Sequence, residues 1–137
     1  MEILALDVGE ARVGIARASA AARLAEPLKT VKTKDTVDYL QDLIKQGDIQ
    51  AIVIGLPRNL SGEETNQTRW VRAWVEQAKP KINKPIYWQD EALTSRGAAA
   101  KLQTSSSKHQ KVDEHSLAAA MILQDFLDTP ESERVKC

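Results

Sequence analysis

The sequence predicts an α/β fold with a five-stranded mixed sheet flanked by helices. Three short extended segments come first, between Ile3 and Val31, and from Val37 onward helical spacing alternates with apolar, strand-like runs. Consecutive strands joined by short turns are typical of an antiparallel meander. Alternating helices and strands are typical of βαβ crossovers, so the whole pattern indicates a meander leading into crossovers.

The predicted strands of the meander lie at 3–6, 12–18 and 24–31. The first is an apolar run that ends at Asp7. The second alternates Val13 and Ile15 with small residues, which is the two-residue period of a strand. The third contains Pro27, which lacks a backbone N–H and therefore suits an edge strand.

The remaining chain predicts helices and strands in alternation, followed by two helices. A helix over 37–44 is stopped by Gly47, and the apolar run 51–54 is expected to be a central strand buried on both faces. Further elements are expected at 70–78 (helix, with Trp70 and Trp74 facing the core), 85–88 (strand), 94–102 (helix) and 113–127 (helix). We expect one domain over residues 1–128 and a frayed tail over 129–137.

Composition excludes several classes of protein. The 19 Lys and Arg balance the 19 Asp and Glu, so only a local basic face could bind nucleic acid. No apolar run approaches the ~20 residues of a membrane span. The single cysteine, Cys137, allows no disulfide within the chain. These observations favour a cytoplasmic protein with no membrane partner.

Acidic residues fall where elements of the predicted sheet end. Asp7 follows the first strand, Asp90 and Glu91 follow the fifth, and Asp113 begins the last helix. Because ligands gather at the carboxyl ends of strands in open α/β sheets, these acids could converge. Converging carboxylates repel one another unless a cation joins them, and hard oxygen ligands suit Mg²⁺ or Mn²⁺. Such an ion can assist phosphodiester hydrolysis.

Each acid also has a structural interpretation. Asp7 could start the turn before Gly9. Asp90 and Glu91 are adjacent, so only one of them can face a site if the strand is extended, and Glu91 is favoured. Asp113 could be the N-cap of the last helix, which is compatible with a metal role.

Candidate phosphate-binding residues surround these acids. Gly9 and Gly14 flank a predicted turn that carries Arg12, and glycine would let backbone N–H groups approach a phosphate. An ordinary hairpin turn would explain the same pattern. Basic residues next to the predicted site could form a local positive face: Arg58, Arg69, Arg72, Arg96, Lys101, Lys108 and Lys111.

The ordered motifs resemble the YqgF family. They are Leu6–Gly9 with Arg12–Ala16, Glu26–Leu28, Val53–Pro57, Asp90–Thr94 and Lys111–Asp113, and the match spans about residues 1–128. The resemblance implies a ribonuclease-H-like fold and a divalent-metal nuclease that trims the 5′ end of precursor 16S ribosomal RNA.

By the same resemblance, Asp7, Glu91 and Asp113 match the acidic catalytic and metal positions. Asp90 is an auxiliary ligand beside them, and Thr94 is a neighbour that contacts nucleic acid. The sequence departs from the family at two positions. Ala92 replaces an arginine that could hold a phosphate, and Ser19 replaces an aspartate.

The expected partners are precursor ribosomal RNA, structured DNA and a pre-ribosomal particle, bound by a monomer or a weak homodimer. Two other functions fit the sequence: a Holliday junction resolvase, and a catalytically weak ribosome-assembly factor that binds nucleic acid. An actin-like nucleotide-binding fragment ranks last, because 137 residues are too few for the two domains such proteins need.

Overall fold

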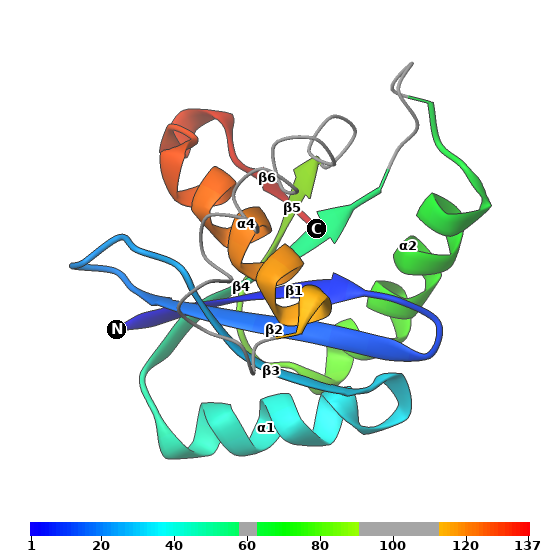
Figure 1. The fold of residues 1–137 in the computed structure, drawn as a ribbon, viewed down its shortest axis with the longest axis horizontal. Coiled ribbons are helices and arrows are strands. Elements are labelled where there is room, and N and C mark those ends of the chain that lie inside the picture. The colour runs from blue at the N-terminus through cyan, green and yellow to red at the C-terminus, as the bar shows by residue number, and fades with distance from the viewer. Residues whose placement is uncertain (58–62, 91–112) are drawn as a thin grey trace.

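A six-stranded mixed sheet forms the centre of the computed structural model, which describes residues 1–57, 63–90 and 113–137 (Figure 1). The strands are β1 Glu2–Val8, β2 Arg12–Ser19, β3 Glu26–Lys32, β4 Ile49–Leu56, β5 Ile86–Asp90 and β6 Val135–Lys136. The helices are α1 Thr36–Gln46, α2 Asn66–Ala78 and α4 Glu114–Asp128, with 3₁₀ turns η1 Thr33–Asp35, η2 Lys79–Lys81 and η3 Glu131–Glu133. The helix expected at 94–102 lies outside the described residues.

The strand order is β3-β2-β1-β4-β5-β6. Strands β1, β2 and β3 pair antiparallel, whereas β1, β4 and β5 pair in parallel. This arrangement confirms the meander followed by crossovers. Strand β3 lies at one edge, as Pro27 predicts, and its register with β2 shifts between Ile15 and Ala16, next to the proline. The shift is consistent with the ladder hydrogen bond that a proline cannot donate.

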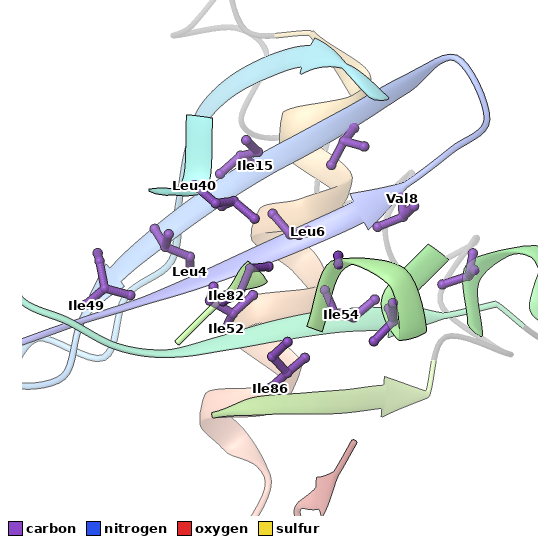
Figure 2. Packing of buried hydrophobic residues seen from close by; sticks show 14 residues of the cluster. Leu4, Leu6, Val8, Ile15, Leu40, Ile49, Ile52, Ile54, Ile82 and Ile86 are labelled. Atoms are coloured by element: carbon purple, nitrogen blue, oxygen red, sulfur yellow. The ribbon is translucent and has the colours of Figure 1, made fainter. Parts of the chain in front are cut away.

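Helices cover both faces of the sheet. On one face α1 and α2 pack over a cluster that includes Leu6, Ile15, Leu40, Ile54 and Val71 (Figure 2). Each of these five side chains is at most 1% exposed, so each contributes about 1.5–3 kcal/mol of burial free energy. Trp70 and Trp74 pack against the edge of this cluster, in agreement with the predicted helix face.

Helix α4 covers the opposite face. Its Leu123 and Phe126 pack against Ala16 of β2, Ala5 of β1 and Val53 of β4. The sheet residues under α4 are mostly small, which lets the helix approach the strands closely. Alternation along each strand therefore separates an α1/α2 face from an α4 face, and this division decides which side chains can meet.

The end of the chain adds a strand that the sequence analysis did not predict. Residues 129–137 were expected to be frayed, but they form η3 and then β6, which pairs antiparallel with β5. The Arg134 guanidinium lies 4.3 Å from the Phe126 ring centroid, and the Cys137 amide donates to the Ile86 carbonyl at 2.8 Å. The sheet has six strands rather than five because this segment covers the backbone edge that β5 would otherwise expose.

None of the helices in the described ranges is long and apolar enough to cross a membrane.

Candidate functional site

A row of three residues crosses the meander on the α4 face. Asp7 of β1 is paired with Gly14 of β2, and Gly14 is paired with Thr30 of β3. Directly opposed residues in antiparallel strands project to the same side of the sheet. Asp7 and Thr30 therefore flank a position with no side chain, at the end of the sheet where β1, β4 and β5 have their carboxyl ends.

The first turn of α4 lies in the space above Gly14. A Cβ built on Gly14 would be 2.0 Å from the His115 carbonyl oxygen and 2.8 Å from the Ser116 amide nitrogen. Only glycine permits such a contact between strand and helix backbones. Gly14 is buried in this contact, which differs from the phosphate-binding role predicted for it from the sequence.

Asp113 joins this turn to the sheet. Its Oδ1 accepts hydrogen bonds from the Ser116 amide at 2.9 Å and the Ser116 hydroxyl at 3.0 Å, so it is the N-cap of α4. The Thr30 hydroxyl donates to the same oxygen at 2.6 Å. Partial burial raises the pKa of Asp113, but these hydrogen bonds and the nearby His115 lower it more, so the pKa lies below its usual value.

Asp7 lies in a depression of about 450 Å³. The depression is lined by Asp7, Val8, Gly9, Glu10, Ala11, Arg12, Gln67 and His115. Burial raises the pKa of the Asp7 carboxyl, and His115 only partly offsets this effect. Within the described ranges, no group donates a hydrogen bond to the Asp7 carboxylate. A half-buried acid without donors is costly to ionise unless a cation or ligand binds it.

His115 relates the two acids to each other. It interacts electrostatically with both Asp7 and Asp113, and in each case it lowers the pKa of the carboxyl. Asp7 and Asp113 thus lie near the same imidazole, on the same face of the sheet. The convergence of these two acids with Glu91 on one cation stays a prediction, because Glu91 lies outside the described residues.

Asp90 is not brought to this face. On β5, Tyr87 packs with the α4 cluster and Trp88 packs with the α1/α2 cluster. Strand alternation then assigns Asp90 to the same side as Trp88, opposite to Asp7. Alternation along β5 therefore does not bring Asp90 to the Asp7 face, and its auxiliary metal role, which the family resemblance implies, stays a prediction. Glu91, the acid favoured by the sequence analysis, lies outside the described residues.

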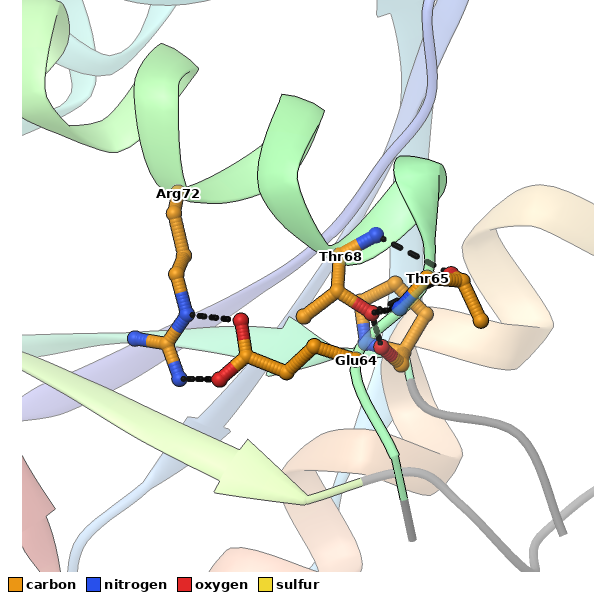
Figure 3. A network of polar contacts seen from close by, with 5 residues as sticks. Glu64, Thr65, Thr68 and Arg72 are labelled. Atoms are coloured by element: carbon orange, nitrogen blue, oxygen red, sulfur yellow. Dashed lines mark hydrogen bonds and ion pairs between the residues drawn. The ribbon is translucent and has the colours of Figure 1, made fainter. Parts of the chain in front are cut away.

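The basic candidates divide into three groups. Arg12 is exposed and lines the Asp7 depression. Arg72 instead forms a two-pronged ion pair with Glu64 at 2.9 Å and lies over the Trp88 ring, and Arg69 donates to Asn66 (Figure 3 shows the Glu64–Arg72 pair). The other basic candidates, and Thr94 with them, lie outside the described residues: Arg58, Arg96, Lys101, Lys108 and Lys111.

Gly9 occupies the β1–β2 turn. Its amide donates to the Arg12 carbonyl at 3.0 Å, and a Cβ there would be 2.9 Å from that oxygen. The turn is thus the ordinary hairpin that the sequence also allowed. The Gly9 amide already has a partner in this turn, so the phosphate contact expected of it is not supported.

Three site residues were missed by the sequence analysis. Thr30 and Ser116 hold Asp113, and Gln67 reaches the depression from the start of α2. Residue Thr68 fixes that start: it forms a capping box with Thr65, and its hydroxyl donates to the Pro57 carbonyl (Figure 3). The only sequence signal for Thr30 is the cross-strand register, which cannot be read without knowing where each turn begins.

The chain is similar to several curated bacterial proteins over nearly its whole length. A protein from Roseiflexus sp. (strain RS-1), named "Putative pre-16S rRNA nuclease", is 34% identical over 134 residues, covering 93% of this chain and 94% of its own. A protein of the same name from Nitratidesulfovibrio vulgaris (strain DP4) is 34% identical over 139 residues, covering 98% of both chains.

Solved structures support the fold. Thermus thermophilus RuvC in complex with a Holliday junction substrate superposes with a TM-score of 0.68 at 16% identity, and both chains are covered completely. A second T. thermophilus RuvC structure gives a TM-score of 0.62 at 17% identity, again with complete coverage. These likenesses confirm the ribonuclease-H-like fold expected from the sequence.

The family model of RuvX, described as Holliday junction resolvase, matches residues 1–129. This match covers both acids of the α4 face and the residues that hold them. Together with the relatives that are 34% identical, it confirms the resemblance noted from the motifs: the chain belongs to the RuvX family, the same family as YqgF.

Proposed function

We propose that this protein hydrolyses phosphodiester bonds in nucleic acid, at the depression between β1 and the start of α4. The observation that carries the proposal is the half-buried Asp7 carboxylate, which receives no hydrogen bond from the described residues and shares His115 with Asp113. The proposed substrate is precursor 16S ribosomal RNA, because the curated relatives carry the name "Putative pre-16S rRNA nuclease". Cleavage at its 5′ end is what the motif resemblance implies.

The donor set fits a divalent metal ion. Asp7 offers a carboxylate without hydrogen-bond donors, and Asp113 engages Oδ1 in three hydrogen bonds while no described residue donates to its Oδ2. Two carboxylates with free oxygens suit Mg²⁺ or Mn²⁺. Within the described ranges no three acidic, His or Cys side chains form a metal cluster. The proposed third ligand is Glu91, which lies outside those ranges and which the family resemblance implies. Such an ion would activate water and stabilise the charge that develops on the phosphate.

The chain's own residues would hold the substrate. Arg12 lines the same depression as Asp7 and carries a positive charge that can bind a phosphate oxygen. Gln67 also lines the depression, and its amide can donate to a sugar or phosphate oxygen. The raised pKa of Asp7 describes the site without a cation. Binding of a cation would favour the ionised carboxylate.

The test uses a 5′-labelled precursor 16S RNA fragment incubated with Mn²⁺, with Mg²⁺ or with a chelator. We expect wild-type protein to cleave it only with the metal, and Asp7→Asn to reduce the rate by more than about a hundredfold, because it removes a charged metal ligand of nearly the same shape. Asp42→Asn is the matched control, since Asp42 is an exposed acid on α1, which covers the other face.

Folding must be compared in the same samples by circular dichroism and thermal unfolding. Cleavage by Asp7→Asn at the wild-type rate would refute the assignment of this site. Cleavage that persists in the chelator would refute the proposed metal dependence. A loss of activity that Asp42→Asn shares would point to a general effect of charge rather than to the site.

A second substrate is favoured by the family description, which names Holliday junctions. The same assay with a four-way DNA junction of synthetic strands separates the two. Preferential cleavage of the RNA supports the first proposal, and symmetric paired cuts in the junction support resolution of recombination intermediates. Because paired cuts need two sites, sedimentation should then detect a dimer on the junction, whereas a monomer suffices for the RNA.

The proposed setting is the bacterial cytoplasm, with the pre-ribosomal particle as the partner that presents the RNA. The relatives' names support this setting through their stated substrate. Cosedimentation of the protein with small-subunit precursor particles, but not with mature subunits, would support it.

A further inference from the structure

A pair of basic residues lies one step outward from the Asp7 row. Arg12 of β2 is paired with Lys32 of β3, two residues along from Gly14 and Thr30 on the same strands. Since alternate residues project to the same face, Arg12 and Lys32 share the α4 face with Asp7. Lys32 was not among the candidates from the sequence, because it lies just beyond the strand predicted at 24–31 and belongs to no motif.

Two like charges directly opposite each other in a sheet repel. Neither Arg12 nor Lys32 forms an ion pair or hydrogen bond through its side chain with any described residue, and both are exposed. Glu10, in the adjacent turn, forms no ion pair with either of them. The pair is therefore a site of positive charge that a bound anion would relieve.

The backbone beneath this pair is held in place. The Thr33 hydroxyl donates to the Gly9 carbonyl at 2.7 Å, and the Thr33 amide donates to the Ala11 carbonyl at 3.1 Å. These bonds tie the β1–β2 turn to the segment that follows β3. The separation of Arg12 and Lys32 is thus set by both the strand register and the turn.

We propose that Arg12 and Lys32 together bind a backbone phosphate of the nucleic-acid strand that enters the Asp7 depression. Arg12 lines the depression itself. Lys32 extends the positive charge to the outer edge of the sheet, because β3 is the edge strand. The proposal rests on the proposed function, and it adds the direction in which the strand leaves the cleavage site, across β2 and β3.

Lys29 provides a matched control on the same strand. It is paired with Ile15, whose side chain is buried in the α1/α2 cluster, and its ammonium lies 5.4 Å from the centroid of the Tyr39 ring. Lys29 therefore lies on the face opposite to Lys32. Replacing either residue by glutamine changes the net charge equally, but only Lys32 would contact the bound nucleic acid.

The experiment measures binding of a fluorescein-labelled single-stranded precursor RNA by anisotropy, in chelator so that no cleavage occurs, between 50 and 200 mM salt. We expect Lys32→Gln to weaken binding several-fold and to reduce the slope of log K against log salt by about 0.7, the value for one phosphate contact on a single strand. Arg12→Gln should have a similar effect. Lys29→Gln should match wild type, and Lys32→Arg should restore the slope.

Equal slopes for Lys32→Gln and Lys29→Gln would overturn this inference. Equal slopes would leave the proposed function intact as long as wild-type protein still cleaves with metal and Asp7→Asn does not. In that case only the phosphate-binding role of Arg12 and Lys32 is refuted. If wild-type protein neither binds nor cleaves nucleic acid, the proposed function itself fails. Thermal unfolding of the variants separates a loss of contact from a loss of fold.

Discussion

At the scale of single residues, Asp113 has two roles that can be separated. Its side chain caps α4 through Ser116, and its charge is stabilised by donors that include Thr30. Asparagine keeps a capping oxygen but has no charge, whereas alanine has neither. Asp113→Ala should therefore lose about 1 kcal/mol of unfolding free energy at neutral pH, the usual cost of losing an N-cap.

The pH dependence distinguishes the charge from the cap. The pKa of Asp113 is lower in the folded protein than its usual value of 3.8. Its ionised form thus contributes stability that is present above about pH 4 and is lost as the pH falls through the lower folded-state pKa. The advantage of wild type over Asp113→Asn should shrink in that range. Urea unfolding at several pH values measures it, and a constant difference would contradict the prediction.

The identity of Asp113 as an N-cap and the half-buried state of Asp7 could be predicted from sequence, since each depends on local pattern. The hydrogen bond from Thr30 could not. It depends on a register between β2 and β3 that includes a shift beside Pro27, and on where the helix axis crosses the sheet. Strand alternation alone predicts that only one of Asp90 and Glu91 can face the site, but it does not say which face of the sheet becomes the site.

At the scale of secondary-structure elements, the contact between α4 and β2 sets the shape of the site. Gly14 leaves no room for a side chain under the helix, so Gly14→Ala must displace the first turn of α4. We expect a loss of about 2 kcal/mol or more, at the upper end of overpacking effects because backbone atoms cannot yield as side chains do.

Gly47→Ala is the control for this prediction. A Cβ on Gly47 would be 3.5 Å from the Leu43 carbonyl oxygen, an ordinary contact, and its φ of −138° is open to any residue. Its stability should stay within about 0.5 kcal/mol of wild type. Chemical denaturation of both variants tests the pair, and equal stability would show that α4 can move aside at little cost.

The order of the strands and helices could be predicted from the sequence because apolar residues repeat with a different spacing in strands and in helices. Strand β6 could not be predicted, because Val135 and Lys136 are exposed and two residues are too few to show a pattern. Their conformation comes from the edge of β5 and from Arg134, which contacts Phe126. A strand formed by pairing alone has no signal in composition.

At the scale of the whole molecule, the reactivity of Cys137 reports on whether β6 stays paired with β5. Burial, which outweighs the neighbouring Lys79 and Arg72, raises the pKa of its thiol from 9.0 to about 12. At pH 8 the reactive thiolate should be roughly a thousandfold scarcer than in the unfolded chain. Labelling with iodoacetamide should therefore be slow in the native protein and fast in denaturant. Equal rates would show that the β5–β6 edge opens freely.

The two acids of the site come from the first strand and from the start of the last long helix. During synthesis, β1 is available early, whereas Asp113 and the apolar side chains of α4 are made late. Until that helix docks, Ala5, Ala16 and Val53 face water and nothing holds a second carboxylate beside Asp7. Cleavage at the proposed site therefore requires that α4 has been made and has docked on the sheet, so a chain without a docked α4 should be inactive.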